Sequence, residues 1–306
     1  MKCEDQIGMK LNDRYLKVDC ETWHDLKSGK IFHHNQYKDT KYGKDFNYLD
    51  DKKNYLNGQH GILKLKKFLR RVDIPLDTSN LQTNDEIIID FLKTNPISFK
   101  NKTVLILGGG PSTNLVNWKK IKFDTLIACN NFIKNKDILQ AQPSLVSFAP
   151  FVDLTHTNQH LHQYIKDVDC TITFEPEHIK KPEEDQLKIF YKEYMDRIFV
   201  FQTRYSSCLG IGARQIILSI LLGAKKIYFT GIDLHNDYEN LQHAYETSKS
   251  MPRWRLMYGK DLQDRQVIIF FDYIRQLREI YNFEIVNLSQ HLDCNKSVSF
   301  ATKKLL

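Results

Sequence analysis

The chain has 306 residues, of which 42% are hydrophobic, and its formal net charge is +7. This length suits one large domain or two modest ones with a buried core, and the apolar fraction argues against global disorder. The mild basicity fits a phosphate-rich ligand or an anionic membrane face, although a lysine-rich composition alone would also produce it. The absence of a long Lys/Arg block in the sequence argues against nucleic acid as a partner.

The six cysteines are scattered without a CxxC pair, which argues against a zinc knuckle. Cys129 and Cys170 stand inside apolar runs, so we expect them to be small core residues in a reducing compartment. The sequence begins without the apolar segment of a secretory signal, and its longest apolar run, near residues 216–222, is too short for a bilayer. These features predict a cytoplasmic protein, with peripheral contact at the inner membrane face as an open alternative.

Residues 1–100 are expected to form an additional N-terminal α+β region whose fold the sequence does not assign. Residues 15–18 and 30–32 are candidate strands. Residues 62–71 predict a basic amphipathic helix, whose basic face is either solvated or held against a membrane. Residues 84–93 predict a second helix, because Asn84 is a plausible N-cap and acidic residues follow it in the first turn.

Seven short apolar runs follow, and they are the main evidence for the fold class. Runs that are apolar on both faces are typical of strands in a buried parallel sheet. Helical periodicity appears at residues 216–221, ending at Gly223, and again at 267–277. The alternation predicts a doubly wound, mostly parallel Rossmann-like α/β domain over residues 101–295, with a tail at 296–306. The predicted strands are residues 103–107, 125–129, 144–148, 170–174, 198–201, 226–230 and 284–288.

The first of these strands runs into a glycine-rich loop, Gly108-Gly109-Gly110-Pro111-Ser112. Ligands bind at the carboxyl edge of such a sheet, and glycines permit close backbone approach. The proline suits the first turn of a helix, whose exposed amides would favour a phosphate, and the serine hydroxyl is a further donor. The loop matches neither a Walker A motif nor GxGxxG, and a tight turn without a ligand is the alternative.

Polar residues follow two further strands. Asn130 and Asn131 come after the strand at 125–129, where an amide can bind ribose, base or sugar hydroxyls, or cap the next turn. Gly231 and Asp233 come after the strand at 226–230. Asp233 is expected either to orient a hydroxyl or act as a base, or to cap a helix or turn. Parallel strands would bring all of these residues to the same edge of the sheet.

These segments together resemble the bacterial sialyltransferases of glycosyltransferase family 42. They are also similar to the related DUF115 group, which includes motility-associated factors and MptE-like pterin pyrophosphokinases. The resemblance covers residues 102–290 and depends on three segments in order: Gly-Gly-Gly-Pro-Ser, Cys-Asn-Asn-Phe, and Leu-Gly-Ala-Lys-Lys-Ile-Tyr-Phe-Thr-Gly-Ile-Asp. It implies a CMP-linked acidic sugar as donor substrate, a glycan or protein as acceptor, and neither a metal nor another cofactor.

The resemblance also implies which residues touch the donor nucleotide. By motif match these are the loop at residues 108–112, Asn130, and the segment Arg204-Tyr205-Ser206-Ser207. About four extra residues separate that last segment from Gly223, so Gly212 is an alternative point of close backbone approach. The full expected donor site is Gly108, Gly109, Gly110, Pro111, Ser112, Asn130, Asn131, Arg204, Ser206, Ser207, Gly212, Gly231, Tyr258 and Lys260.

The catalytic base of the resembled family is a histidine that follows a glycine, and here Lys260 follows Gly259 instead. His235 and His243 are the nearest histidines, and with Asp233 they are the candidate catalytic residues. A histidine near neutral pKa can deprotonate an acceptor hydroxyl, although a solvated loop histidine is the alternative for each. Tyr258 and Lys260 are expected to neutralise the departing phosphate.

A metal site is not expected, although His156 and His160 are spaced to share a helix face. The sequence offers no HExxH motif and no nearby carboxylate trio. Two other functions stay open: a magnesium-dependent MptE-like pyrophosphokinase, for which Asp233 and Asp237 are the only nearby carboxylate pair, and a non-catalytic nucleotide-binding module. Self-association is a further open alternative.

Overall fold

The computed structural model describes residues 97–148, 152–174, 184–203, 210–233 and 277–289, with residues 270 and 274–275 and five short strands nearer the N-terminus. Several predicted features lie outside the described residues. These are the helix at 62–71, the tail at 296–306, and the site residues Arg204, Ser206, Ser207, His235, His243, Tyr258 and Lys260.

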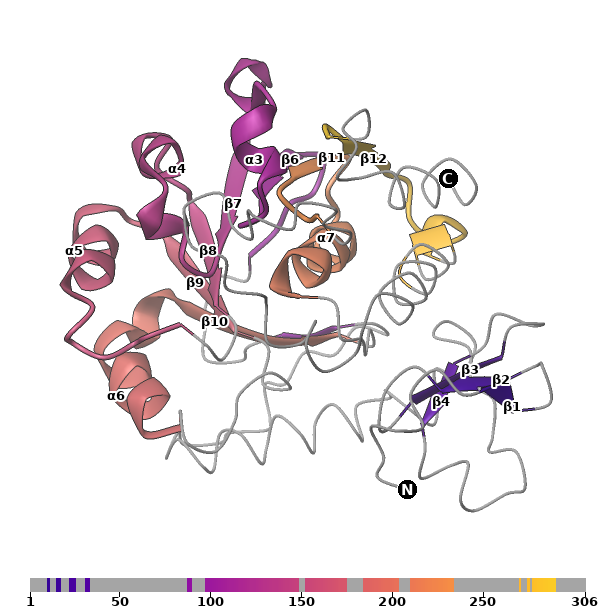
Figure 1. The fold of residues 1–306 in the computed structure, drawn as a ribbon, viewed down its shortest axis with the longest axis horizontal. Coiled ribbons are helices and arrows are strands. Elements are labelled where there is room, and N and C mark those ends of the chain that lie inside the picture. Colours follow the sequence, from indigo (N-terminus) through magenta and orange to yellow (C-terminus); the bar gives the residue numbers. More distant parts are fainter. Residues whose placement is uncertain are drawn as a thin grey trace.

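An eight-stranded sheet with the order β12-β11-β6-β7-β8-β9-β10-β5 forms the centre of the described structure (Figure 1). Seven neighbouring strands are parallel, and β5 runs antiparallel to β10. The predicted mostly parallel α/β fold is therefore confirmed, and each of the seven predicted strands forms. The bounds of all eight strands are β5 (Ile87–Ile89), β6 (Thr103–Leu107), β7 (Thr125–Cys129), β8 (Leu145–Phe148), β9 (Thr171–Phe174), β10 (Ile198–Thr203), β11 (Lys226–Thr230) and β12 (Glu284–Asn287).

Helices cover both faces of this sheet, as Figure 1 shows, because successive strand residues point to opposite faces and both sets are apolar. Val104 and Ile106 of β6 pack in one core with α7, and Leu105 and Leu107 pack in the other. The second core lies beneath helices α4 to α6. The helix bounds are α3 (Ser112–Leu115), α4 (Lys136–Gln140), α5 (Gln159–Asp167), α6 (Glu184–Tyr194) and α7 (Ile211–Leu221), with 3-10 turns η2 (Trp118–Lys120), η3 (Phe132–Lys134) and η6 (Met195–Arg197).

Helix α7 is buried along its whole length, which fits a sequence that is apolar on nearly every side. It packs against strands β6, β7, β8, β10 and β11. The predicted end at Gly223 is confirmed, since this glycine has a φ of +88° and its N–H bonds to the Ile220 carbonyl. The next N–H, from Ala224, bonds to the Ser219 carbonyl, and the two bonds together form a Schellman motif.

The helix predicted at 84–93 is wrong, because residues Ile87–Ile89 form strand β5. Three consecutive β-branched residues disfavour a helix and favour a strand, and the edge of β10 supplies the backbone partners. The sheet therefore includes a strand from before residue 100, where the sequence suggested that the nucleotide-binding domain begins.

A separate four-stranded antiparallel sheet lies nearer the N-terminus, in the order β1-β2-β3-β4. Its strands are β1 (Lys10–Leu11), β2 (Tyr15–Lys17), β3 (Thr22–Asp25) and β4 (Ile31–His33). The two strands predicted from the sequence in this region, near residues 15–18 and 30–32, are confirmed as β2 and β4.

Candidate functional site

The sheet has its topological switch point between β6 and β11. From β6 the chain adds β7, β8, β9 and β10 on one side, and then crosses back to add β11 and β12 on the other. In open α/β sheets, ligands bind at the carboxyl ends of the strands at such a point. The loop Gly108–Pro111 leaves β6 here, and Gly231–Asp233 leaves β11 beside it. Two of the segments predicted from the sequence to hold a nucleotide therefore meet.

The glycines in these two loops are required by the contact between the loops themselves. A Cβ atom on Gly108 would lie 2.2 Å from the Gly231 carbonyl oxygen, and one on Gly110 would lie 2.4 Å from an Asp233 carboxylate oxygen. Gly231 has a φ of +71°, and its Cβ would lie 2.0 Å from the Thr113 hydroxyl. Two backbone hydrogen bonds join the loops: the Gly110 N–H donates to the Gly231 carbonyl, and the Gly108 N–H donates to the Thr230 carbonyl. The two loops therefore form one tightly packed unit.

Ser112 and Asp233 join the two loops through their side chains. One carboxylate oxygen of Asp233 accepts the Ser112 N–H at 2.8 Å, and the other accepts the Ser112 hydroxyl at 2.6 Å. The Ser112 oxygen in turn accepts the Gly231 N–H at 2.8 Å and lies 3.0 Å from the Thr230 hydroxyl. Because the single hydroxyl proton of Ser112 is used on Asp233, Thr230 donates in this last contact. Asp233 thus acts as a cap for α3.

This arrangement changes the expected place of a phosphate. The first amide of α3 already donates to a carboxylate, and the next two, from Thr113 and Asn114, donate to the Gly110 and Pro111 carbonyls. The first three amides of α3 thus have partners inside the protein, and phosphate binding at this helix stays a prediction. Ser112 is 0% exposed and the Thr113 hydroxyl donates to the Gly108 carbonyl, so both hydroxyls serve the protein. The predicted contact of Ser112 with a nucleotide stays a prediction, and its visible role is to position the loops.

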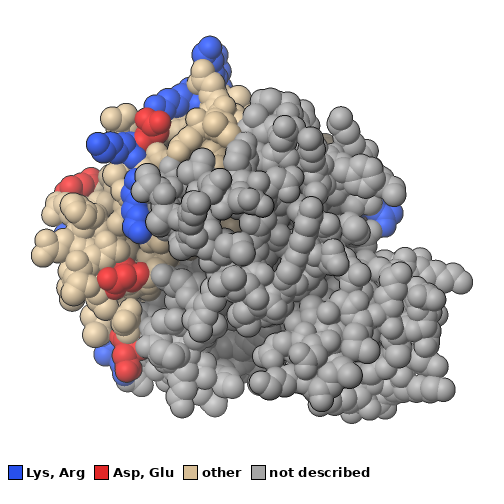
Figure 2. Space-filling view, in the orientation of Figure 1, with Lys and Arg blue, Asp and Glu red and all other residues tan. Residues whose placement is uncertain are grey.

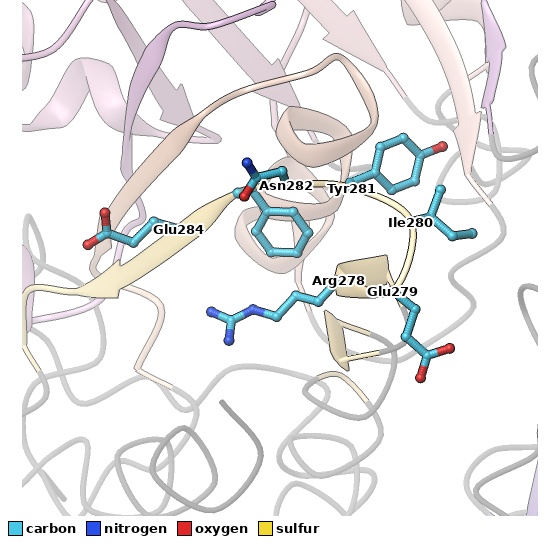
Figure 3. Close-up of a pocket in the computed structure, with 7 residues that line it drawn as sticks. Arg278, Glu279, Ile280, Tyr281, Asn282 and Glu284 are labelled. Carbon is cyan, nitrogen blue, oxygen red and sulfur yellow. The ribbon is translucent and has the colours of Figure 1, made fainter.

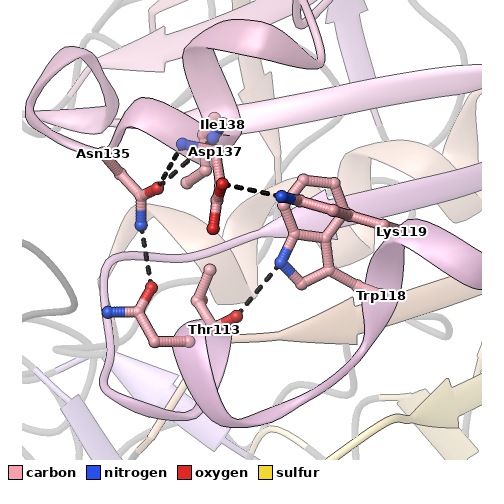
Figure 4. Close-up of polar contacts among 7 residues, drawn as sticks. Thr113, Trp118, Lys119, Asn135, Asp137 and Ile138 are labelled. Atoms are coloured by element: carbon pink, nitrogen blue, oxygen red, sulfur yellow. Dashed lines mark hydrogen bonds and ion pairs between the residues drawn. The ribbon is translucent and has the colours of Figure 1, made fainter.

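On its other side, α3 is held by a polar network with η2 and α4 (Figure 4). The side-chain oxygen of Asn135 caps α4 by accepting hydrogen bonds from the N–H groups of Asp137 and Ile138. The side-chain NH2 group of Asn135 donates to the side-chain oxygen of Asn114 at 3.0 Å. The Trp118 indole N–H donates to the Thr113 carbonyl at 3.1 Å. The short helix after the glycine loop is therefore fixed from both sides.

Asn130 and Asn131 lie at the carboxyl end of β7, the strand next to β6. Asn130 adopts a φ of +53°, a left-handed conformation that asparagine tolerates better than most residues. Its N–H donates to the Ser147 carbonyl on β8. Asn131 precedes η3 and makes no side-chain cap there, and both side chains are half-buried. The structure thus places both residues at the predicted edge of the sheet.

The N-terminus of α7 lies against the same unit. A Cβ on Gly212 would lie 2.9 Å from Ile232 Cγ1, so this glycine allows the helix to approach the loop after β11. Gly210, the N-cap residue of α7, is exposed, has open space around it and provides no side-chain cap. The first turn of α7 contains no acidic residue. Among the described residues, no carboxylate caps this helix start as Asp233 caps α3, so its dipole favours an anion.

Polar residues in α7 are the functional candidates that the sequence analysis missed. Arg214, the fourth residue of the helix, is 1% exposed, and Gln215 is 0% exposed. The Gln215 amide donates to the Ser147 hydroxyl at 2.8 Å, while its carbonyl oxygen has no bond among the described residues. The one signal in the sequence was that an arginine and a glutamine stand inside an otherwise apolar helix. A search for hydrophobic periodicity does not register such residues, although burying them without partners is costly.

The histidines near α5 are arranged differently from the prediction. Helix α5 begins at Gln159, so His156 precedes the helix and does not share a helical face with His160. His156 instead lies against His162, with ring centroids 4.7 Å apart, and both approach Glu193 of α6.

The described part of the surface also contains a shallow hollow of about 380 Å³, lined by residues 278–284 (Figure 3). The chain segment before β12 forms it, including Arg278, whose guanidinium lies over the Phe283 ring at 5.7 Å. This is the amino end of β12, opposite to the carboxyl edge that holds the predicted site. The hollow therefore lies away from the place where we expect a substrate to bind.

On the described part of the face shown in Figure 2, basic and acidic side chains are mixed. Over η2 and α4, the exposed lysines include Lys119 and Lys136, and Asp137 lies among them. Lys119 pairs with Asp137 at 2.6 Å. This mixture is not the single-sign stripe that a nucleic-acid groove requires. Within the described residues, none of the helices has the length and apolarity needed to cross a bilayer.

Comparison with known proteins found likeness at the level of solved structures. The crystal structure of the sialyltransferase CST-II with a trisaccharide acceptor and CMP aligns with 64% of this chain and 85% of its own, at 18% identity and a TM-score of 0.44. CstII from Campylobacter jejuni with CMP-3FNeuAc aligns with 67% of this chain and 85% of its own, at 17% identity and a TM-score of 0.43. Neither the protein-family models nor the curated proteins gave a match. Roles for individual residues therefore depend on this chain's own geometry.

Proposed function

We propose that the chain is a glycosyltransferase that transfers an acidic sugar from a CMP-linked donor to a glycan or protein acceptor. One observation carries the proposal: the described motif residues all meet at the topological switch point of the sheet. The loop after β6, the loop after β11 and the start of α7 touch one another there, and Asn130 ends the next strand. The order of these motifs, which resembles family 42, supports CMP as the nucleotide.

The geometry supports the start of α7 as the place for the donor phosphate. Asp233 places a negative charge at the start of α3, which would repel a phosphate there. The start of α7 has no carboxylate in its first turn, and a buried arginine, Arg214, follows directly. An anion at a helix N-terminus gains from both the free amides and the dipole. The predicted donor residues Arg204, Ser206 and Ser207 come just before this helix in the sequence.

In the proposed reaction, the acceptor hydroxyl attacks the anomeric carbon of the donor sugar. The new bond joins the acceptor oxygen to that carbon, and the bond from the carbon to the phosphate oxygen breaks, which releases CMP. The acceptor proton passes to His235 or His243, and Tyr258 and Lys260 neutralise the leaving phosphate. Asp233 has a positioning role in this scheme, because both of its carboxylate oxygens bind Ser112.

Calorimetric titration of the full chain with CMP, CDP, UDP and ATP tests the donor. We expect CMP and CDP to bind in the presence of EDTA. If neither binds at millimolar concentration while another nucleotide binds well, the donor is wrong. Binding of ATP with magnesium-dependent consumption in the presence of a hydroxymethylpterin would instead identify the pyrophosphokinase. The Asp233 contacts with Ser112 make Asp233 and Asp237 a poor magnesium pair.

Donor hydrolysis by the wild type and by the His235→Ala and His243→Ala variants tests the base. We expect one of the two variants to lower kcat by at least about 100-fold, the usual contribution of a general base. His160→Ala is a matched control, because His160 is an exposed histidine of α5. Absence of turnover by the wild type across a panel of nucleotide sugars would favour the non-catalytic module.

A further inference from the structure

A cluster of histidine and carboxylate side chains joins the loop before α5 to the last turn of α6. His156 Nε2 lies 3.5 Å from Glu193 Oε2, and His162 Nδ1 lies 3.8 Å from the same oxygen. One ligand atom from each residue lies within 4.8 Å of those of the other two. These three residues are hereafter called the His156 cluster. Figure 1 shows the two helices that carry His162 and Glu193 next to each other at the edge of the molecule.

We propose that the His156 cluster binds a divalent transition-metal ion, with Zn²⁺ as the best match. Two imidazoles and one carboxylate form a ligand set that zinc sites use when a fourth position is left open. Ligand bonds of about 2.0–2.1 Å in a tetrahedron place neighbouring ligand atoms about 3.3–3.4 Å apart. The two measured separations exceed this by only a few tenths of an ångström. The ligand atoms of the third pair, His156 and His162, lie within 4.8 Å, so side-chain rotations that bring these two rings closer would complete the geometry.

The ring of His162 offers Nδ1 as its ligand atom to the metal. Its ring is 7% exposed, and its Nε2 lies 3.3 Å from the Leu154 carbonyl oxygen, which can only accept a proton. A proton on Nε2 satisfies this carbonyl and leaves Nδ1 as an acceptor, 3.8 Å from Glu193 Oε2. A backbone carbonyl behind the ring is the usual outer partner of a metal-ligating histidine. The Tyr194 hydroxyl, which lies 2.6 Å from Nδ1, would have to release this nitrogen on metal binding.

The other two ligands are also held in place. Glu193 uses its Oε1 in a contact with Lys166 Nζ at 3.8 Å, which leaves Oε2 for the metal. The loop that carries His156 is built around Asp153, whose carboxylate accepts the Thr155 N–H and the Thr155 and Thr157 hydroxyls. The side chain of His156 is 64% exposed, so an ion has access from solvent and the open position would take water.

The proposed ion is structural, and it is independent of the proposed glycosyl transfer. Its ligands come from the loop before α5, from α5 itself and from α6, so binding would tie that loop and the two helices together. Three side chains that converge before an ion arrives cost less entropy on binding than three from unconnected loops. The two imidazole rings, one exposed and one buried, have their centroids 4.7 Å apart beside the Glu193 carboxylate, as a shared ion would require.

The test measures Zn²⁺ affinity of the full chain, kept reduced and stripped of metal, by competition with a zinc chelator. We expect His156→Ala and Glu193→Gln to weaken the tightest site by at least about tenfold, the lower end of what loss of even an outer-shell partner costs. His160→Ala, a nearby exposed histidine outside the cluster, should bind like the wild type. Equal weakening by all three variants, or by none, would overturn the proposal.

Two further readouts separate this site from the six cysteines of the chain. Co²⁺ in place of Zn²⁺ should produce visible ligand-field bands without thiolate charge transfer, and His156→Ala should remove those bands. A thiolate band that persists in His156→Ala as the main signal would assign the metal to cysteine and refute the proposal. Zinc at 100 times its Kd should also raise the Tm of the wild type, on the order of 5 °C, and leave the Tm of Glu193→Gln unchanged.

Discussion

At the residue scale, the glycines of the loop after β6 have a different structural role from the ligand contact that the sequence indicates. Gly108, Gly110 and Gly231 are glycines because two backbones meet, and a Cβ on any of them would lie only 2.0–2.4 Å from an atom across the interface. Close approach to a ligand was the expected reason. As a consequence, the two loops at the candidate site pack tightly against each other, and hydrogen bonds between Ser112 and Asp233 join them. A buried network of this kind is costly to break in part, since each orphaned polar group loses its partner.

Alanine at Gly231 should destabilise the protein strongly. The left-handed conformation costs an alanine about 1–2 kcal/mol, and the overlap with the Thr113 hydroxyl adds about 1–3 kcal/mol. We expect Gly231→Ala to lower the free energy of unfolding by about 3 kcal/mol, measured by urea denaturation. Gly210→Ala is the control: nothing lies within 4 Å of its Cβ, so the loss should stay below about 1 kcal/mol. Equal losses at the two positions would contradict the packing argument.

The buried thiols make a second prediction at this scale. Burial raises the pKa of the Cys129 thiol to about 12 and that of the Cys170 thiol to about 11. The thiolate is the reactive form, and a raised pKa keeps it scarce at every pH below these values. Peptide mapping after maleimide treatment of the native protein at about pH 8 should leave both cysteines unmodified, whereas treatment in urea should modify both. Rapid native labelling of Cys129 would disprove its burial.

At the scale of elements, two helix starts at the same edge of the sheet have opposite electrostatics. Helix α3 is only four residues long, and Asp233 occupies its first amide. Helix α7 has eleven residues, begins at an exposed glycine without a side-chain cap, and has no acidic residue in its first turn. The longer helix therefore offers the better anion site, although the shorter one follows the glycine-rich loop that sequence reasoning favours.

A carboxylate at Gly210 should separate the stability of α7 from its affinity for a nucleotide. The extended conformation at this N-cap position suits Asp and Asn alike, so both should stabilise the helix by a few tenths of a kcal/mol. Only Gly210→Asp puts a negative charge where we place the donor phosphate. We expect calorimetry to show CMP binding at least about tenfold weaker in Gly210→Asp, a loss of about 1.4 kcal/mol. Gly210→Asn should bind like the wild type, and equal weakening in both variants would move the phosphate elsewhere.

At the scale of the whole molecule, the sheet extends beyond the domain boundary that composition suggests. Strand β5 comes from residues 87–89 and pairs with β10 through three residue pairs. Without it, the outer backbone groups of β10 would form an open edge, and open edges promote pairing between molecules. The stretch before residue 100 therefore contributes a strand to the large α/β sheet as well as the smaller four-stranded sheet.

Truncation tests this extension of the domain. A chain that begins at residue 80 keeps β5, and one that begins at residue 97 loses it while retaining every other strand of the large sheet. We expect the shorter chain to unfold at lower urea concentration and to show more light scattering at equal protein concentration. If the two chains have the same unfolding midpoint and the same scattering, β5 does not protect this edge.

The sequence by itself determined the seven parallel strands of the large sheet and the end of α7. Continuous apolar runs are local signals, and so is a glycine that can adopt a positive φ. Only the tertiary structure decided which residues meet: Ser112 and Asp233 are 121 positions apart, and His156 faces Glu193 rather than His160. Strand β5 shows the same limit, since its pairing partner β10 lies far away in the sequence. Hydrogen-bond partners depend on strand order and helix placement, which local patterns do not encode.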